Sequence, residues 1–505
     1  MDTMTLTSCT PECACCAHSA PAEATDELLR GLGIPGGGYV AGEWLQGPLT
    51  LEVTDPEDGS LVARVYEAQA ADMDRAVGGV QRSLREDTWE LWERREVLER
   101  ASDLVRAESA RLARIISSEG SKTITEATRE VARTAETLKI SAHSAALLEG
   151  ETLPFEDTAR GAGKFGYYRR VPLGVVAAIT PFNDPMNLVA HKVGPGLLAG
   201  NAIVLKPAAV TPLSALALHD ILLRAGMPAQ RMAVLASGRE AGSALVGDPR
   251  IAAVSFTGGP STGDTIARIA GARKLLMELG GNNAVLVCED GDVESAAEGI
   301  VDGAFGVAGQ NCLSVQRVFV HASHYERLVS LVAAGAERLV VGSKRDASTD
   351  VGPLIAERES RRVEEWVEEA IAGGARAVAG RRREGAFYWP TVLVDVPSDA
   401  RVSREEVFGP VVLIEPFTEV DAALEAMDDT EYGLQAGVFT ASLRTAMHAV
   451  DRLHMGSVLV NDTSDFRIDA MPFGGSKRSG VGREGVAEAV RELSEPKNVI
   501  LNRAF

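Results

Sequence analysis

The chain has 505 residues, a formal net charge of −20, and apolar and charged fractions of 45% and 24%. This length predicts two or more domains, and the balanced composition excludes a wholly disordered chain. Nucleic acids and anionic membranes are bound mainly through lysine and arginine, so the negative charge argues against both and favours a small-molecule ligand. No apolar run approaches the roughly 20 residues of a membrane span, and the start lacks a secretory pattern, which predicts a cytoplasmic protein.

The cysteines are unevenly distributed. Four of the six crowd the start of the chain near His18, at Cys9, Cys13, Cys15 and Cys16. Because only Cys288 and Cys312 remain in the body, a disulfide framework there is excluded. The spacing of the first four fits no standard zinc or iron–sulfur pattern, so we expect no metal, with a soft-metal site as the alternative. Residues 1–24 are predicted to form a disordered tail.

The first predicted elements are helices. Apolar positions three and four residues apart indicate amphipathic helices over residues 72–120 and 121–148. Beyond Arg169, short apolar runs alternate with helical stretches, which is typical of a parallel, doubly wound sheet. These runs are residues 174–179, 202–206, 232–236, 253–257, 274–279 and 284–288.

Unusual residues follow several of these strands. Ligands bind doubly wound sheets at the carboxyl ends of the strands, where this sequence places the loops 180–187, 206–212 and 256–263. The third loop is similar to a dinucleotide-binding turn, but Pro260 replaces the middle glycine of GxGxxG. On its own that turn is a weak signal, and the three loops together predict one ligand-binding crevice.

A second α/β region is predicted from about residue 290 to residue 475. Its expected helices lie near 323–339 and 357–373, and its expected strands near 411–416, 437–440 and 457–461. Two further strand-like segments, 165–171 and 497–501, have no sheet of their own. They are predicted to pair with each other or with a partner chain, which indicates an oligomer.

Cys312 and Glu278 offer a nucleophile and a base. A thiol with its ordinary pKa of about 8.5 is mostly protonated at neutral pH, so a catalytic cysteine needs a suitable setting and a proton acceptor. Cys312 could instead be a buried core thiol, but the preceding Gly-Gln-Asn argues against apolar packing. Glu278 lies among leucines, and because a buried carboxylate is costly, a functional role explains it better than a paired strand end. Cys288 is predicted to be structural.

Seven motifs together resemble the aldehyde dehydrogenase superfamily in order and spacing: PFND, LKPA, FTGG, MELGGNN, GQNC, EEVFGPV and MPFGGSKRSGVGREG. The resemblance covers about residues 35–503. It implies an α/β fold with a Rossmann-type, doubly wound parallel cofactor domain, an α/β catalytic domain and a small β oligomerisation element. The implied NAD(P)-binding domain is 25–150 and 172–285, the catalytic domain 286–480, and the oligomerisation element 151–171 and 481–505. A homodimer or homotetramer is expected.

The resemblance implies oxidation of an aldehyde to a carboxylic acid. Cys312 would attack the carbonyl carbon, and the Asn183 amide and the backbone N–H of Cys312 would hold the resulting oxyanion. Glu278 would activate the water that hydrolyses the thioester. Taken alone, Asn183 could equally be a turn residue before Pro185.

The implied cofactor is NAD or NADP. Lys206 would bind the adenosine ribose, Glu406 the nicotinamide ribose, and Phe408 would pack near the nicotinamide ring, although both charged residues could be ordinary surface groups. At Ala209 many NAD-preferring members carry a glutamate that repels a 2′-phosphate, so its absence permits NADP. Glycines at the helix start would admit the pyrophosphate. The full predicted set is Thr180, Pro181, Phe182, Lys206, Ala209, Gly238, Thr257, Gly258, Gly259, Ser261, Leu279, Glu406 and Phe408.

Arg467 lies in the segment that lines the aldehyde entrance in this family. Arginine suits carboxylate, phosphonate or phosphate recognition, so we expect a small anionic aldehyde, such as a phosphono-aldehyde, lactaldehyde or a semialdehyde. Pairing of Arg467 with Asp465 or Asp469 is the alternative. Arg129 is a second candidate for binding the anion.

Two stretches, PFNDPMNLVAHK and RIDAMPFGG, look like the branch of phosphonoacetaldehyde, phosphonoformaldehyde and lactaldehyde dehydrogenases. Some phosphonate-specific members have arginine directly before the cysteine, where this chain has Asn311. Two other functions compete with hydrolytic oxidation. A CoA-acylating enzyme is disfavoured by Glu278, which such relatives commonly lack. A catalytically silent structural homologue is disfavoured because Cys312, Glu278 and Asn183 occur together.

Overall fold

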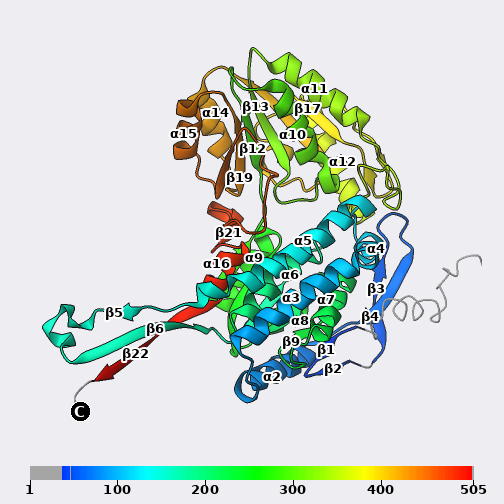
Figure 1. The fold of residues 1–505 in the computed structure, drawn as a ribbon. Helices are drawn as coiled ribbons and strands as arrows, with labels where there is room; N and C mark the ends of the chain where they lie inside the picture. The colour runs from blue at the N-terminus through cyan, green and yellow to red at the C-terminus, as the bar shows by residue number, and fades with distance from the viewer. Residues whose placement is uncertain (1–36, 46, 503–505) are drawn as a thin grey trace, which may run out of the picture.

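The computed structural model describes residues 37–45 and 47–502. The predicted cysteine-rich tail lies outside these residues. Two large sheets, each flanked by helices, form two α/β layers, and a three-stranded arm projects from the body (Figure 1). Within the described part of the chain, no helix is long and apolar enough to span a bilayer.

The first sheet has the strand order β2-β1-β9-β8-β7-β10-β11-β21. Its strands are β1 (Tyr39–Val40), β2 (Glu43–Trp44), β7 (Val175–Ile179), β8 (Ala202–Lys206), β9 (Met232–Val234), β10 (Ile251–Thr257), β11 (Lys274–Glu278) and β21 (Gly480–Val481). The strands from β9 to β11 run parallel. Chain order reverses between β7 and β10, which is where a doubly wound sheet binds its ligand.

Helices cover both faces of this sheet. They are α2 (Ala70–Glu86), α3 (Leu91–Ala107), α4 (Ser109–Glu119), α5 (Ile124–His143), α6 (Asn187–Leu198), α7 (Leu213–Arg224), α8 (Arg239–Gly247) and α9 (Pro260–Ala270). Alternate residues of β8 enter different cores because strand side chains alternate in direction. Ile203 and Leu205 pack with α3 to α7, whereas Ala202 and Val204 pack with α2, α8 and α9. The helices predicted over 72–148 are confirmed. A separate antiparallel hairpin, β3 (Leu49–Thr54) and β4 (Leu61–Tyr66), precedes them in the chain.

The second sheet has the order β14-β17-β18-β13-β12-β19-β20. Its strands are β12 (Asn283–Val287), β13 (Val315–His321), β14 (Arg376–Ala379), β17 (Thr391–Val394), β18 (Val411–Phe417), β19 (Gln435–Phe439) and β20 (Ser457–Val460). Its helices are α10 (Val293–Phe305), α11 (Tyr325–Arg338), α12 (Glu357–Ala372), α13 (Arg401–Arg404), α14 (Val420–Asp428) and α15 (Leu443–Arg452). A small hairpin, β15 (Arg383–Glu384) and β16 (Phe387–Tyr388), lies beside them.

One strand assignment was wrong. The run 284–288 was predicted in the first sheet, but β12 pairs with β13 and β19 in the second. The predicted domain boundary at residue 285 therefore falls inside β12. Because a strand buried on both faces is apolar throughout, its sequence does not indicate which of two neighbouring sheets it joins. The chain leaves the first sheet directly after Glu278, at Gly280 and Gly281.

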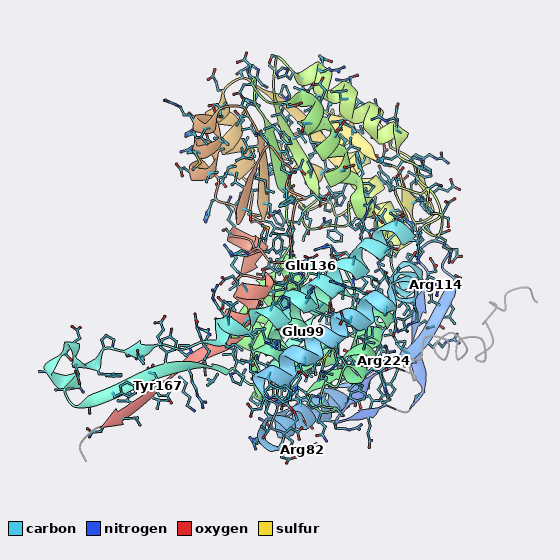
Figure 2. All side chains as sticks on the ribbon, in the orientation of Figure 1. Arg82, Glu99, Arg114, Glu136, Tyr167 and Arg224 are labelled. Atoms are coloured by element: carbon cyan, nitrogen blue, oxygen red, sulfur yellow. The ribbon has the colours of Figure 1, made fainter. Side chains whose placement is uncertain are left out.

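The arm consists of β5 (Thr152–Leu153), β6 (Lys164–Pro172) and β22 (Ser494–Asn502). β22 pairs antiparallel with β6 along its whole length, so the two leftover strands pair with each other. Tyr167 lies on this arm, away from the body (Figure 2). The last predicted segment, 481–505, also includes α16 (Val486–Glu492), which packs against α6 in the body.

Candidate active site

Two cavities meet between the sheets. The strand-end cavity, about 420 Å³, is lined by the last residues of four parallel strands, Ile179, Lys206, Thr257 and Glu278. The helix-side cavity, about 600 Å³, lies beside α5 and α10. The residues that line both cavities are Asn183, Leu188, Cys312 and Arg467. The two cavities therefore share the predicted nucleophile, the predicted oxyanion donor and the predicted anion-binding arginine.

Most predicted cofactor residues line the strand-end cavity: Thr180, Pro181, Phe182, Lys206, Thr257, Gly258, Gly259, Leu279, Glu406 and Phe408. Three others lie outside its lining. Gly238 is the N-cap of α8, Ser261 is in the first turn of α9, and Ala209 follows β8. The lining also includes Ala208 and Thr262, which the sequence motifs did not single out.

The strand-end cavity is open where the N-terminus of α9 lines it. Gly259 caps the N-terminus of α9, and a β-carbon added there would meet no atom within 4 Å. A helix N-terminus attracts phosphate through its free N–H groups and its dipole. Burial lowers the pKa of Lys206, whose side chain lies so close to Gly242 that a β-carbon there would be 2.9 Å from Cε. Phe182 and Phe408 meet edge to face at 5.8 Å and bound the other end.

Glu406 is held by the glycine pair that follows β11. The N–H of Gly281 donates to Glu406 Oε1 at 3.0 Å. A β-carbon on Gly280 would lie 2.3 Å from Glu406 Oε2, so only glycine leaves space for this carboxyl group. Burial raises the pKa of Glu406 to about 7. The two glycines of MELGGNN thus position a hydrogen-bonding carboxyl at the cavity wall.

Cys312 lies in a loop, and the backbone that leads to it is strained. Val307, Ala308 and Gly309 are left-handed in succession, with φ of 52°, 53° and 69°. Such angles are unfavourable for Val, which is branched at Cβ, so neighbouring contacts must hold them. Glu126 Oε1 accepts from the N–H of Val307 at 2.7 Å, and the Asn283 amide donates to the Cys312 carbonyl at 2.8 Å. The loop is therefore tied to α5 on one side and β12 on the other.

The surroundings of Cys312 and Glu278 favour their uncharged forms. Burial and the carboxyl of Glu406 raise the pKa of the Cys312 thiol to about 12, with Arg467 acting against them. Burial and neighbouring Glu484 raise the pKa of Glu278 well above its usual range. Glu278 Oε2 is buried without a hydrogen-bond partner. A raised pKa suits a carboxyl group that must exchange a proton with water near neutral pH.

The side chain of Arg467 is only 7% exposed, yet its positive charge has only a long contact, 3.5 Å, with the carboxylate of Glu484 to balance it. Its guanidinium lies 3.8 Å above the Phe473 ring, and its Nη2 is 3.5 Å from Glu484 Oε2. No described residue forms a hydrogen bond with its Nε or Nη2. Pairing with Asp465 or Asp469 is contradicted, because Asp465 binds Asn311 and Asp469 binds other cations. Donor capacity thus remains on Arg467 where the two cavities meet.

The partner of Arg467 belongs to a buried ion pair that the motifs did not reveal. Lys192 Nζ lies 2.6 Å from Glu484 Oε1 and 2.7 Å from Thr257 Oγ1. The signal was present, since Lys192 occurs within the apolar sequence of α6, and a lysine there requires a buried partner. Which acid supplies that partner depends on packing across the chain.

The loop that carries Asn183 is anchored by charges from α5. Arg133 contacts Asp184 at 3.4 Å and Asp469 at 2.9 Å, and Lys122 pairs with Asp184 as well. His191 also binds Asp469, at 2.8 Å. The segments that carry Asn183 and Arg467 are therefore joined through Arg133. Arg129, the second predicted anion site, is exposed and lines the helix-side cavity.

Comparison with known proteins shows the family of the chain. Residues 44–499 match the aldehyde dehydrogenase family. The chain is 43% identical over 465 residues to 3-sulfolactaldehyde dehydrogenase of Priestia aryabhattai, covering 92% of this chain and 97% of that protein. It is 43% identical over 453 residues to aspartate-semialdehyde dehydrogenase 1 of Pseudomonas canavaninivorans, covering 90% and 96%.

A solved structure shows the same fold. Glyceraldehyde-3-phosphate dehydrogenase GapN from Methanocaldococcus jannaschii, complexed with NADP, matches with a TM-score of 0.87 and 32% identity, covering 90% of this chain and all (100%) of that chain. The predicted α/β fold is confirmed by this match and by the sheet topology. The chain therefore belongs to the aldehyde dehydrogenase family, as an NAD(P)-dependent enzyme.

Proposed function

We propose that this enzyme oxidises a small anionic aldehyde to its carboxylic acid through a thioester on Cys312. The observation that carries this proposal is the buried guanidinium of Arg467. It lines both cavities beside Cys312 and, among the residues that the structure describes, has two nitrogens without hydrogen bonds and an ion-pair contact with Glu484 at 3.5 Å. A carboxylate, sulfonate or phosphonate would complete its hydrogen bonding, because a planar guanidinium matches these oxygens in two-point contacts.

The proposed reaction starts at the shared wall of the two cavities. Cys312 loses its thiol proton to water and the resulting thiolate adds to the aldehyde carbon, while the Asn183 amide and the Cys312 N–H hold the oxyanion. The cofactor, when bound in the strand-end cavity, supplies the acceptor for the hydride that leaves this carbon. Glu278 then takes a proton from water, which attacks the thioester and releases the acid and the free thiol.

The same proposal assigns the cofactor contacts. Lys206 binds the adenosine ribose, Glu406 the nicotinamide ribose, and Gly258 and Gly259 admit the pyrophosphate at the start of α9. Ala209 presents no carboxylate against a 2′-phosphate, so NAD and NADP both remain open. Calorimetric titration with each nucleotide decides between them.

The substrate class agrees with the relatives. Sulfolactaldehyde and aspartate semialdehyde, named for two proteins 43% identical to this one, are small aldehydes that carry an acid group. Phosphono-aldehydes and lactaldehyde belong in the same test, because the motif stretches resemble enzymes for them. Asn311 replaces the arginine that some phosphonate enzymes have before the cysteine, which favours sulfonates and carboxylates within this class.

The test is an aldehyde panel with NAD or NADP, with and without CoA, followed by absorbance of the reduced cofactor. The unmodified enzyme is expected to oxidise acidic aldehydes without CoA. Turnover that requires CoA would show a CoA-acylating enzyme in place of a hydrolytic one, and no turnover with any aldehyde would favour a catalytically silent structural homologue.

Arg467→Ala should raise KM for acidic aldehydes roughly 10- to 100-fold, as expected for one hydrogen bond to a charged group, and should leave KM for neutral aldehydes unchanged. An equal loss on both would contradict charge recognition.

We also propose a homodimer or homotetramer assembled through the arm. Ile500 and Leu501 on β22 are 54% and 50% exposed, which is more apolar exposure than a monomer's strand usually carries. Light scattering should give two or four times the 53.4 kDa mass of the chain. Ile500→Asp should shift this mass toward the monomer, and an unchanged mass would place the interface elsewhere.

A further inference from the structure

Asn311 and Asp465 form a pair beside the nucleophile. Asn311 Nδ2 donates to Asp465 Oδ1 at 2.5 Å, and its Oδ1 accepts from the N–H of Leu313 at 3.2 Å. This orientation is chemically fixed, because a carboxylate only accepts and a backbone N–H only donates. The Asn311 carbonyl is therefore turned toward the Cys312 thiol, which lies 3.8 Å away. Asp465 is thus one side chain removed from the reacting sulfur.

The pair occupies the helix-side cavity together with Arg467. Asn311, Cys312, Asp465 and Arg467 all line that cavity. Although the sequence places Asp465 near Arg467, they form no ion pair, and among the described residues no basic side chain pairs with the Asp465 carboxylate. Asn311 occupies one carboxylate oxygen. The wall of the cavity thus presents a carboxylate oxygen that Asn311 leaves unused and, two residues along the chain, a guanidinium whose Nε and Nη2 have unused donor capacity.

This combination is poorly suited to a simple anionic aldehyde. A partly buried carboxylate with no directly paired cation is costly, although the nearby charge of Arg133 offsets part of that cost, and an approaching acid group would be repelled by it. Both difficulties disappear if the substrate carries a hydrogen-bond donor as well as an acid group. Burial raises the pKa of Asp465 to about 6, so the carboxylate still predominates at neutral pH and can accept that donor.

We infer that Asp465, held by Asn311, accepts a hydrogen bond from a hydroxyl or ammonium group on the substrate while Arg467 binds its acid group. The enzyme would therefore select acidic aldehydes that carry such a donor between the carbonyl and the acid group. This inference deepens the proposed function and rests on it. Both substrates named for the relatives have this form, one with a hydroxyl and one with an amine.

The test compares aldehydes that differ only in the donor. Aspartate semialdehyde is paired with succinate semialdehyde, which lacks the ammonium, and 3-sulfolactaldehyde with 3-sulfopropanal, which lacks the hydroxyl. In at least one pair the unmodified enzyme should show kcat/KM at least about tenfold higher for the member with the donor, the scale of one hydrogen bond to a charged group. Asp465→Ala should bring that ratio close to one, mainly by lowering turnover of the donor-bearing member.

Asp350→Ala is the matched control, because Asp350 also lines the helix-side cavity but is exposed. This variant should keep the preference for the aldehyde that carries the donor.

A kcat/KM ratio near one for both pairs in the unmodified enzyme would overturn the inference. An equal loss of kcat/KM on both members of a pair in Asp465→Ala would also overturn it, since that pattern indicates that Asp465 only positions Asn311. If Asp465→Ala does not fold, inhibition of the unmodified enzyme gives the answer: aspartate should inhibit more strongly than succinate, and the reverse order contradicts the inference.

The results also separate this inference from the proposed function. Turnover of neutral aldehydes with none of the four acidic ones would refute the proposed substrate class itself. Turnover of both members of each pair at equal rates would refute only the role of Asp465.

Discussion

The two cavities of this enzyme are built in different ways. The strand-end cavity is made from strand ends, glycines and apolar rings, and most of its wall belongs to short continuous motifs. The helix-side cavity is lined by charged side chains of α5 and α10 and of the segment that carries Arg467, and their partners come from other parts of the chain, as Asp469 does for Arg133. The first is specified by local sequence and the second by packing between distant segments. Cofactor binding and aldehyde selection should therefore respond separately to mutation.

The largest effect is expected at Cys312, which both cavities share. Cys312→Ser should lower turnover at least about a thousandfold, because a neutral hydroxyl is a far weaker nucleophile than a thiolate. NAD(P) affinity, measured by calorimetry, should stay within about twofold. Cys288→Ser is the control, since Cys288 is buried near the end of β12 and should leave turnover unchanged. A lost cofactor affinity in Cys312→Ser would show that the two cavities are not separable.

Glu278→Gln should slow steady turnover roughly a hundredfold while a stoichiometric burst of reduced cofactor remains. The base works when deprotonated, and its pKa is raised well above the usual carboxyl range. Turnover should therefore fall as pH drops through this raised pKa, at a higher pH than an ordinary glutamate would give. Stopped-flow absorbance across pH measures both quantities. Steady turnover that equals the unmodified enzyme would remove Glu278 from deacylation.

Lys206→Ala should weaken cofactor binding by about tenfold and leave KM for the aldehyde unchanged, because Lys206 lines only the strand-end cavity. The control is Lys274→Ala, because Lys274 is the first residue of the parallel strand β11, away from the strand ends that line the cavity, and pairs with Glu492. It should leave nucleotide affinity intact. A parallel rise in aldehyde KM for Lys206→Ala would break the separation between the cavities.

The smallest effect is expected at Arg129. It is exposed, so water and salt screen its charge. Arg129→Ala should raise KM for acidic aldehydes only about two- to threefold at low salt, and the difference should vanish near 0.5 M salt, where the screening length is about 4 Å. Initial rates at two salt concentrations measure this. An effect as large as that of Arg467→Ala, and insensitive to salt, would make Arg129 a direct ligand.

Sequence motifs predicted most of the wall of one cavity but not the charge partners in the other. Lys206 could be placed at the predicted crevice because it ends a parallel strand, and strand ends share one edge of a sheet, whereas Glu278 was singled out by its motif. The setting of Arg467 could not be predicted from its neighbours. Asp465 and Asp469 are nearer in sequence, but both bind other side chains, and Glu484 reaches Arg467 only in the folded chain. The sheet to which β12 belongs was unpredictable for a similar reason, since its apolar residues suit either sheet.

The left-handed run before Cys312 has a consequence for attempts to make this enzyme more heat-resistant. Val307 and Ala308 each hold a backbone conformation that costs on the order of 1–3 kcal/mol, so replacing Val307 by glycine relieves strain in the folded state. The same replacement loosens the backbone that aims the thiol. Variants selected only for a higher melting temperature would therefore accumulate substitutions at Val307 and Ala308, and these variants would be more stable but turn over more slowly. Selection for activity after heating would keep the run intact and direct improvement to the arm or the helix surfaces.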